Sequence, residues 1–252
     1  MLTFANLTTG YGHTIVSRNL TATLLPGVTA LVAPNGKGKS TLLRTLAALQ
    51  PPLSGTIRYG DRPIAALTPT ERARHVAVVL TAHPAPPSLT VRETVSMGRI
   101  PHSSLLRPYS AADRRAVSEA LAQAGAEPFA DRPVNTLSDG QRQRVYLAKA
   151  LAQETPVIFL DEPTAYLDPA ASAEVLRLLS RLAREQGKTI LLTTHDITGA
   201  LLHADRLWML STDTIHEGTP RQLLRSGALN DILHQQGATV NKDRLTLTYS
   251  LA

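Results

Sequence analysis

The chain of 252 residues is long enough for one large α/β domain or two small ones, and its composition, 43% hydrophobic and 18% charged, is that of a globular protein with a sizeable core. A net charge of +6 and a pI near 9.9 make it moderately basic, but the basic residues are spread along the sequence, so no nucleic-acid partner is expected. The absence of cysteine excludes disulfides. No apolar run approaches the roughly 18 residues of a membrane span, and residues 1–10 lack the layout of a signal peptide. We therefore expect a chain that is neither inserted into a membrane nor secreted.

The first predicted elements are an antiparallel β layer and a core strand. Apolar residues in Leu2–Leu7 and in Thr21–Leu24 indicate the layer. Val28–Val32 is a short apolar run that leads into a Gly-rich turn. Leucines at helical spacing then predict a helix over Lys39–Leu49.

Three later apolar runs are predicted core strands, namely His75–Leu80, Val157–Leu160 and Thr189–Thr193. Short runs rich in Val, Ile and Leu, separated by helical patterns, are typical of a parallel sheet covered on both faces. The intervening segment, roughly residues 84–153, is helix-rich and carries no comparable strand. It therefore reads as a helical insertion in an α/β core.

These elements predict one α/β domain over residues 1–252. Its core comprises approximately residues 1–83 and 154–252, and the helical subdomain comprises approximately residues 84–153. In the tail after Asn241, apolar residues alternate with Thr and Ser, which predicts a late edge strand without an assigned function.

The turn after the first core strand has the pattern of a phosphate-binding loop between a strand and a helix. Its residues are Ala33, Pro34, Asn35, Gly36, Lys37, Gly38, Lys39, Ser40 and Thr41. Backbone N–H groups at a helix N-terminus hold phosphate oxygens, and glycine lets the chain wrap close around them. We expect Lys39 to reach the β- and γ-phosphates of ATP and the Ser40 hydroxyl to ligate Mg²⁺.

Two residues of this loop are unusual. Ala33 occupies the position where the motif has its first glycine, and Lys37 stands where a small residue is common. The Lys37 charge could add phosphate affinity or meet an acidic group of another subunit. A solvated surface lysine is the interpretation we favour, because surface ion pairs are weak.

The strand Val157–Leu160 delivers two carboxylates, Asp161 and Glu162, at its C-terminal end, where open α/β sheets bind ligands. We expect Asp161 to hold the Mg²⁺ shell and Glu162 to act as the general base toward the attacking water.

A second helix N-terminus begins in Leu137–Gln141. Ser138 is a good N-cap, and the apolar residues of Arg142–Ala152 give the helix one apolar face. A chain with one phosphate-binding loop has no obvious need for a second phosphate-seeking helix N-terminus.

Leu137–Gln141 resembles the LSGGQ signature of the ATP-binding cassette (ABC) ATPases. Other motifs of that family follow in order. Tyr11 resembles the aromatic residue that stacks on adenine, Tyr166–Asp168 resembles the D-loop with Asp168, and Thr193–Asp196 resembles the H-loop with His195. The resemblance implies a P-loop NTPase (RecA-like) core with an antiparallel β subdomain and a helical subdomain.

In that family, the signature of one subunit closes over ATP held by the phosphate-binding loop of another. The resemblance therefore implies ATP and Mg²⁺ as cofactors and a dimer of two copies, or of one copy with a homologous ATPase. It implies a contact of His195 with the γ-phosphate. The signature residues implied to contact ATP across the dimer are Ser138, Asp139, Gly140 and Gln141.

Besides Ala33 and Lys37, two further positions depart from the family pattern. Thr81 stands where many relatives carry a Gln that contacts Mg²⁺ or the lytic water, so we expect altered coupling or slower hydrolysis. Asp139 replaces the first glycine of the signature. A carboxylate would repel a γ-phosphate, so we expect Asp139 to point away and to leave Ser138 and the Gly140 N–H for binding.

The stretch Leu89–His102 contains a Gly-Arg-x-Pro sequence that resembles the iron-chelate, haem and cobalamin importers. The resemblance implies an ATPase subunit that drives transport of an iron siderophore or related metal chelate. Its implied partners are a separate permease and, indirectly, an extracytoplasmic substrate-binding protein, and its implied place is the cytoplasmic face of the membrane. The alternatives are a soluble ABC ATPase acting on nucleic acid or ribosomes and a regulatory subunit with low turnover.

Overall fold

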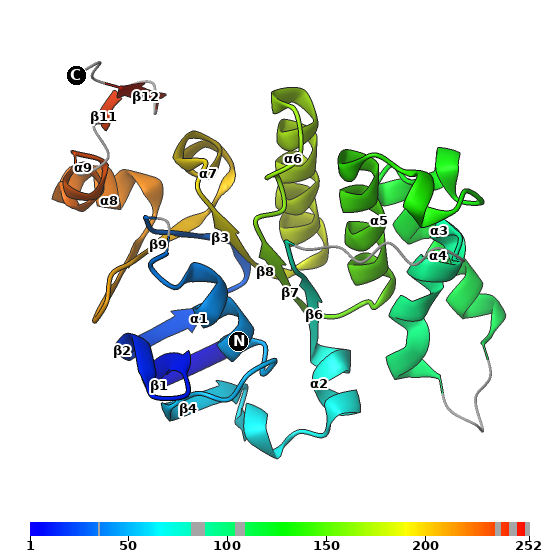
Figure 1. Ribbon diagram of the computed structural model, residues 1–252, viewed down its shortest axis with the longest axis horizontal. Coiled ribbons are helices and arrows are strands. Elements are labelled where there is room, and N and C mark those ends of the chain that lie inside the picture. The colour runs from blue at the N-terminus through cyan, green and yellow to red at the C-terminus, as the bar shows by residue number, and fades with distance from the viewer. Residues whose placement is uncertain (35, 82–88, 104–108, 235–237, 242–245, 250–252) are drawn as a thin grey trace. The chain divides into compact units, whose positions relative to one another are not determined.

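The computed structural model describes residues 1–34, 36–81, 89–103, 109–234, 238–241 and 246–249 (Figure 1). Asn35 of the phosphate-binding loop lies outside the described residues. The chain divides into two compact units, one formed by Met1–Ala66 with Leu179–Ala252 and the other by Leu67–Leu178. The boundaries expected for a helical subdomain, near residues 84 and 153, stay a prediction.

The first unit contains an antiparallel β layer in the order β2-β1-β4-β5. Its strands are β1 (Leu2–Tyr11), β2 (Thr14–Leu24), β4 (Ser54–Tyr59) and β5 (Arg62–Pro63). The predicted layer is thus confirmed, although the sequence pattern indicated only its first two strands. Leu2 pairs with Leu24 and, on the other side, with Tyr59.

Parallel strands form the core of the same unit. β3 (Gly27–Val32) pairs in parallel with β8 (Thr189–Thr194) and with β9 (Arg206–Leu210), and β10 (Ile215–Gly218) is antiparallel to β9. The predicted strands at β3 and β8 are confirmed, whereas β9 and β10 were not predicted. Trp208 is fully buried and meets Phe4 edge-on at 5.7 Å between ring centroids, which joins the core to the β layer.

The helix after β3 is shorter than expected. α1 (Lys39–Leu46) ends before Leu49, which is 55% exposed. Ala48 has a left-handed backbone with φ +54°, and the N–H groups of Ala48 and Leu49 bond back to the carbonyls of Thr45 and Arg44. This is a Schellman-type helix end, which requires one left-handed residue and turns the next residue off the helix face. The prediction that Leu49 lies on this helix was wrong.

The first unit also contains the 3₁₀ helix η1 (Ile64–Ala66), and its other elements follow β8. They are α7 (Ile197–His203), α8 (Pro220–Ser226), α9 (Ala228–His234), β11 (Ala238–Asn241) and β12 (Thr246–Tyr249). β11 and β12 pair with each other in an antiparallel two-stranded sheet. A strand in the tail is therefore confirmed, and its described partner is β11.

The second unit combines two parallel strands with helices. β6 (Val76–Val79) pairs with β7 (Val157–Asp161), so that Val79 lies beside Leu160. Both predicted strands are confirmed. The helices are α2 (Pro69–His75), α3 (Val91–Ser96), the 3₁₀ helix η2 (Met97–His102), α4 (Ala111–Gln123), η3 (Glu127–Phe129), η4 (Val134–Thr136) and α5 (Asp139–Ala152). The division between the units falls within α6 (Pro169–Gln186).

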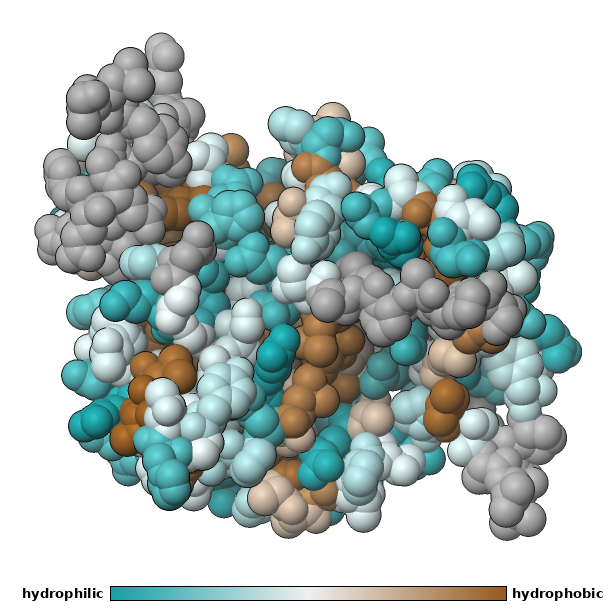
Figure 2. Space-filling model, viewed as in Figure 1, coloured by the Kyte–Doolittle hydropathy of each residue, from teal (hydrophilic) through white to brown (hydrophobic). Residues whose placement is uncertain are grey.

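Apolar side chains are not confined to the interior. Figure 2 shows one face of the molecule, on which hydrophobic areas lie among hydrophilic ones. Large hydrophobic residues with high exposure include Tyr11, Met97, Ile100 and Tyr166. Among the described residues, every helix is too short or too polar to cross a membrane.

Candidate nucleotide site

The phosphate-binding loop and His195 start from neighbouring strand ends in the first unit. Val32, the last residue of β3, is in register with Thr194, the last residue of β8. Ala33 and His195 therefore leave the sheet side by side. His195 is exposed, and the next residue, Asp196, caps α7 by accepting a hydrogen bond of 2.9 Å from the Gly199 N–H. A strand on one side and a helix cap on the other thus present His195 at the edge where parallel sheets bind ligands.

The loop wraps closely because two glycines adopt a left-handed backbone. Gly36 has φ +75° and Gly38 has φ +91°. A Cβ atom at Gly38 would collide with the Val16 side chain of β2, whereas one at Gly36 would meet nothing within 4 Å. Two features therefore require glycine at position 38: the left-handed backbone and the close approach to the Val16 side chain. Lys37 is exposed, as expected for a solvated lysine.

The start of α1 is suited to an anion. Its N-cap is Gly38, which offers no side-chain acceptor, and no acidic residue lies in the first turn. Backbone N–H groups and the positive end of the helix dipole therefore face the loop. Lys39 is buried, and its Nζ donates a hydrogen bond of 3.0 Å to the Ala33 carbonyl. The Lys39 ammonium thus lies within the turn that it is expected to share with phosphate.

Tyr11 lies beside the same loop. Its hydroxyl is 3.2 Å from the Thr41 hydroxyl, and the residue is 52% exposed. The hydrogen bond holds the aromatic side chain near the start of α1 while leaving it accessible. A flat, accessible ring in this position can stack on a base.

In the second unit, β7 carries the two carboxylates. Asp161 is buried, with 2% of its surface exposed, and Glu162 is partly buried. Glu162 has φ +53°, a left-handed conformation that is strained for a residue with a side chain. Thr81, beyond the end of β6, donates its hydroxyl hydrogen to the Asp161 main-chain carbonyl at 3.1 Å. The predicted Mg²⁺-facing residues Thr81 and Asp161 are therefore neighbours.

The signature residues form the first turn of α5, and the predicted N-cap at Ser138 is confirmed. Ser138 Oγ accepts from the Gln141 N–H at 3.3 Å, and the Gln141 side chain accepts from the Ser138 N–H at 3.2 Å, a capping box. The Asp139 carboxylate pairs with Arg142 one turn later. A Cβ atom on Gly140 would approach the Leu167 side chain to 3.1 Å. The signature therefore lies close to Leu167 at this glycine, and a methyl group there would require a small shift of the Leu167 side chain.

Asp168 has a structural role as well as its expected one. Its Oδ1 accepts from the Ala171 N–H at 2.9 Å, which caps the start of α6. Sequence reasoning missed this cap, the strain at Glu162, the packing of Leu167 and the partner of Asp139. Two of these had a local signal: Asp168 precedes Pro169 and bonds three residues ahead, as N-cap residues do, and Arg142 lies three residues after Asp139 on the helix.

The two units each hold part of the predicted site. In the first unit are Tyr11, Ala33, Pro34, Gly36, Lys37, Gly38, Lys39, Ser40, Thr41 and His195. In the second unit are Thr81, Ser138, Asp139, Gly140, Gln141, Asp161, Glu162 and Asp168. Within the described ranges, no cluster of three or more His, Asp or Glu side chains could hold a metal ion by itself.

The sequence model of the ABC transporter family matches residues 18–165, more than half of the chain. This chain belongs to the ABC transporter family. The stated resemblance and the α/β P-loop architecture are therefore confirmed, and the chain is an ATPase of the ABC type.

Known ABC proteins match over most of their length. The iron(3+)-hydroxamate import ATP-binding protein FhuC of Bacillus subtilis is 38% identical over 96% of this chain and 92% of its own. The ferric enterobactin transport ATP-binding protein FepC of Escherichia coli is 39% identical over 90% of this chain and 84% of its own. A bacterial ABC transporter cassette solved as a dimer has a TM-score of 0.78 at 29% identity and covers 87% of this chain and 99% of its own. The same cassette was also solved in a post-hydrolysis state with ADP and phosphate.

Proposed function

We propose that this chain is the ATP-binding subunit of an importer for an iron siderophore or a related metal chelate. The observation that carries the proposal is the similarity, over nine-tenths of the chain, to ATP-binding proteins of ferric hydroxamate and ferric enterobactin import. The Gly98-Arg99-x-Pro101 sequence supports the same class, because the sequence alone already resembled such importers. A separate permease spans the membrane, this chain lies on its cytoplasmic face, and an extracytoplasmic protein delivers the chelate.

The nucleotide is bound between two copies of the chain. The loop of one copy, with Lys39 and the N–H groups of α1, holds the phosphates, and Tyr11 stacks on adenine. The signature of the other copy, with Ser138 at its N-cap, closes the site. This arrangement explains why one chain has two helix N-termini suited to phosphate. Dimeric cassettes of the same family support it.

Mg²⁺ fits the oxygen donors that the chain offers. Ser40 is part of the phosphate-binding loop and lies in the first turn of α1, and the buried Asp161 is the last residue of β7. The ion would neutralise charge on the phosphate oxygens when bound. Thr81 keeps its hydroxyl on the Asp161 carbonyl, so it serves the metal site by holding this strand end in place.

Glu162 accepts the proton of the attacking water, and His195 contacts the γ-phosphate. The left-handed backbone at Glu162 ends the extended conformation of the chain directly after β7, and Glu162 is less buried than Asp161. Strain of this kind, about 1–3 kcal/mol per residue, is commonly retained at functional sites. The two adjacent carboxylates can therefore have separate roles.

The Glu162→Gln variant tests this function. It should hydrolyse MgATP at least about a hundredfold more slowly, in line with loss of a general base, while ATP still binds and traps a dimer in size-exclusion chromatography. The matched control is Glu174→Gln, an exposed glutamate outside the proposed site whose Arg144 ion pair is on the surface. Normal turnover by the Glu162→Gln variant would contradict the assigned base.

Import is tested in the source organism. Cells whose only copy of the gene carries Glu162→Gln should lose uptake of iron-labelled ferric siderophore, and the wild-type gene should restore it. Unchanged uptake would refute import of such chelates. A low-turnover regulatory subunit is the second candidate, favoured by Thr81 and Asp139. It predicts that purified wild-type chain hydrolyses MgATP no faster than the Glu162→Gln variant.

A further inference from the structure

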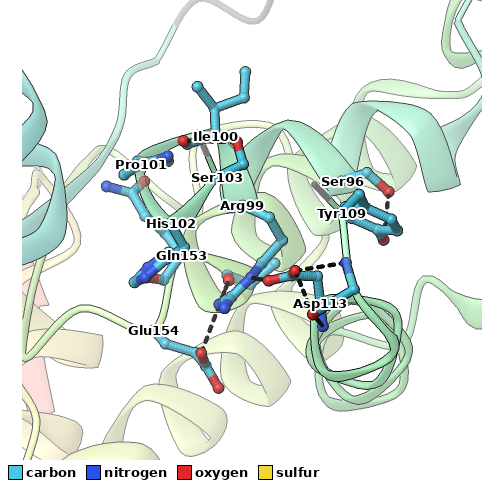
Figure 3. Close-up of polar contacts among 12 residues, drawn as sticks. Ser96, Arg99, Ile100, Pro101, His102, Ser103, Tyr109, Asp113, Gln153 and Glu154 are labelled. Carbon is cyan, nitrogen blue, oxygen red and sulfur yellow. Dashed lines mark hydrogen bonds and ion pairs between the residues drawn. The ribbon is translucent and has the colours of Figure 1, made fainter. Parts of the chain in front are cut away.

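One arginine of η2 holds residues 152–155, which are the last residue of the signature helix α5 and the first three residues of the link to β7. Arg99 Nη1 donates to the Ala152 carbonyl at 2.7 Å and pairs with the Glu154 carboxylate at 2.5 Å. Its Nε binds the Asp113 carboxylate at 2.9 Å. Figure 3 shows the Arg99 side chain reaching between Asp113 and Glu154. A single guanidinium therefore ties η2, α4 and the end of α5 together. We call residues 152–155 the junction.

A second group of bonds attaches the junction to its other neighbours. The Nε2 atom of His102 lies 2.9 Å from the Gln153 carbonyl, and the Gln153 side-chain amide donates to the Val76 carbonyl at 3.1 Å and to the Ala73 carbonyl. The Thr155 hydroxyl donates to the Val157 carbonyl at 2.7 Å. The junction thus contacts η2 on one side and the starts of β6 and β7 on the other.

The Arg99 contacts with Asp113 and with the Ala152 carbonyl are buried, whereas the Glu154 carboxylate is partly exposed. The side chains of Arg99 and Asp113 are 6% and 3% exposed, and Asp113 also accepts bonds from the Ser110 N–H and hydroxyl. Buried charges persist only when they are paired and hydrogen-bonded, which restricts the guanidinium to one arrangement. Next to it, a Cβ atom on Gly98 would collide with the Lys149 carbonyl, so η2 lies directly against α5.

The junction connects two elements that each carry predicted site residues at their far end. α5 begins with the signature, and β7 ends at Asp161, which Glu162 follows directly. At the opposite side, η2 exposes Ile100, which is 64% accessible. Arg99 and His102 supply the polar contacts between η2 and the junction, and Gly98 adds a direct packing contact with α5. A displacement of η2 can therefore reach both the signature helix and β7 through these contacts.

We propose that Arg99 is a positioning residue that transmits the position of η2 to both the signature helix and the Asp161–Glu162 strand end. The proposal rests on the proposed ATPase function. Arg99 touches no nucleotide, so it acts on the turnover step through α5 and β7. ATP affinity of the isolated chain depends instead on Tyr11 and the loop 33–41, which belong to the other unit.

Two variants of the full-length chain test this role. Glu154→Gln removes the ion pair with Arg99 and retains the size and shape of the side chain, which is 56% exposed. Arg99→Lys keeps a charge beside Asp113, but one ammonium cannot replace the planar fork that binds three groups. The matched control is Asp131→Asn, which breaks the Arg92–Asp131 pair of the same unit without touching the junction.

We expect kcat to fall while the affinity for ATP stays nearly unchanged. The kcat of MgATP hydrolysis should fall about threefold in Glu154→Gln and about tenfold in Arg99→Lys, while the Kd for ATP stays within about twofold. Hydrogen exchange of peptides covering residues 139–161 should quicken in both variants and stay at the wild-type rate in Asp131→Asn. A role confined to global stability would lower Tm without this difference between kcat and Kd.

Three outcomes overturn the proposal: wild-type kcat in both variants, a change in ATP Kd with kcat preserved, or wild-type exchange over residues 139–161. If Arg99→Lys does not fold, Glu154→Gln decides by the same measures. A wild-type chain without ATP hydrolysis refutes the proposed function instead, and the exchange measurement then still decides whether Arg99 holds the junction.

Discussion

The Thr81 hydroxyl donates a hydrogen bond to the Asp161 main-chain carbonyl at 3.1 Å and so joins the chain beyond β6 to the last residue of β7. The resemblance to the ABC family leads us to expect a longer glutamine at the position of Thr81. A threonine whose hydroxyl is bound to the main chain supports the strand end, but it cannot also extend over the distance that a glutamine covers. The Thr81 side chain thus stabilises the C-terminal end of β7, but it is too short to make the contacts that a glutamine side chain would make at this position.

The Thr81→Gln variant should therefore change the kcat of MgATP hydrolysis, and we expect an increase of about threefold to tenfold, from the 0.5–2 kcal/mol typical of such coupled positions. Steady-state phosphate release measures it. Thr81→Val is the control, because it keeps the shape, loses the bond to Asp161, and should lower stability by about 1 kcal/mol without raising kcat. Identical turnover of Thr81→Gln and wild type would remove the idea that this position limits hydrolysis.

The glycines of the phosphate-binding loop should differ in their tolerance of alanine. Gly38→Ala places a methyl group against Val16 at a left-handed φ of +91°, so ATP affinity should fall at least about tenfold. Gly36→Ala has open space around the methyl group and should cost only about 1–2 kcal/mol of backbone strain. Equilibrium binding of a fluorescent ATP analogue, with thermal unfolding alongside, compares the two. Equal losses of affinity would show that the Val16 contact is unimportant.

Tyr11 should contribute to ATP affinity through its ring. Tyr11→Ala should raise the Kd for ATP about tenfold, since stacking of a base on an aromatic side chain contributes about 1–3 kcal/mol. Tyr11→Phe keeps the ring and loses only the 3.2 Å contact with the Thr41 hydroxyl, so its Kd should stay within about threefold of wild type. Isothermal titration with ATP separates the two effects, and a Kd for Tyr11→Ala equal to that of Tyr11→Phe would argue against stacking.

The contact between Gly140 and Leu167 should couple the signature to the following loop. A methyl group in Gly140→Ala comes within 3.1 Å of Leu167 Cδ2, and the displacement of Leu167 should lower kcat about tenfold. Leu167→Ala in the same chain removes the clash and should restore part of that loss. A double-mutant cycle on kcat tests this, and strictly additive effects would show that the two residues are not coupled.

Asp113 should give the protein a pH-dependent contribution to stability. Hydrogen bonds from the Ser110 hydroxyl and N–H, and the adjacent Arg99 guanidinium, hold the pKa of the Asp113 carboxyl well below its ordinary value of 3.8. Because the folded-state pKa is the lower one, the stabilisation is fully present above that ordinary value and is lost as pH falls through the folded-state pKa.

The Asp113→Asn variant should therefore be less stable than wild type at pH 5–7, by a difference in unfolding free energy that is constant there and narrows below about pH 4. Urea denaturation at a series of pH values measures the difference. Glu119→Gln on the solvent side of α4 is the control, and its difference from wild type should be small throughout. If the difference in unfolding free energy between wild type and Asp113→Asn became larger on acidification, the pKa of Asp113 would not be lowered by folding.

Local sequence determined much of this protein. The core strands β3, β6, β7 and β8 were predictable because each is a short run of buried apolar residues, and the Ser138 cap was predictable because its hydroxyl bonds only three residues away. The phosphate-binding loop, the carboxylate pair and the signature are contiguous motifs. Each of these motifs consists of neighbouring residues, so the sequence alone indicates the family without any tertiary contact.

Only the tertiary structure decided the features that depend on distant partners or on single backbone angles. Arg99 finds Asp113, Ala152 and Glu154 at separations of 14, 53 and 55 residues, and no spacing in the sequence indicates such a set. The end of α1 depends on one left-handed residue, Ala48, and apolar periodicity carries no information about φ. Long-range pairs and backbone strain are stabilised by the surrounding packing, and that packing exists only once the chain has folded.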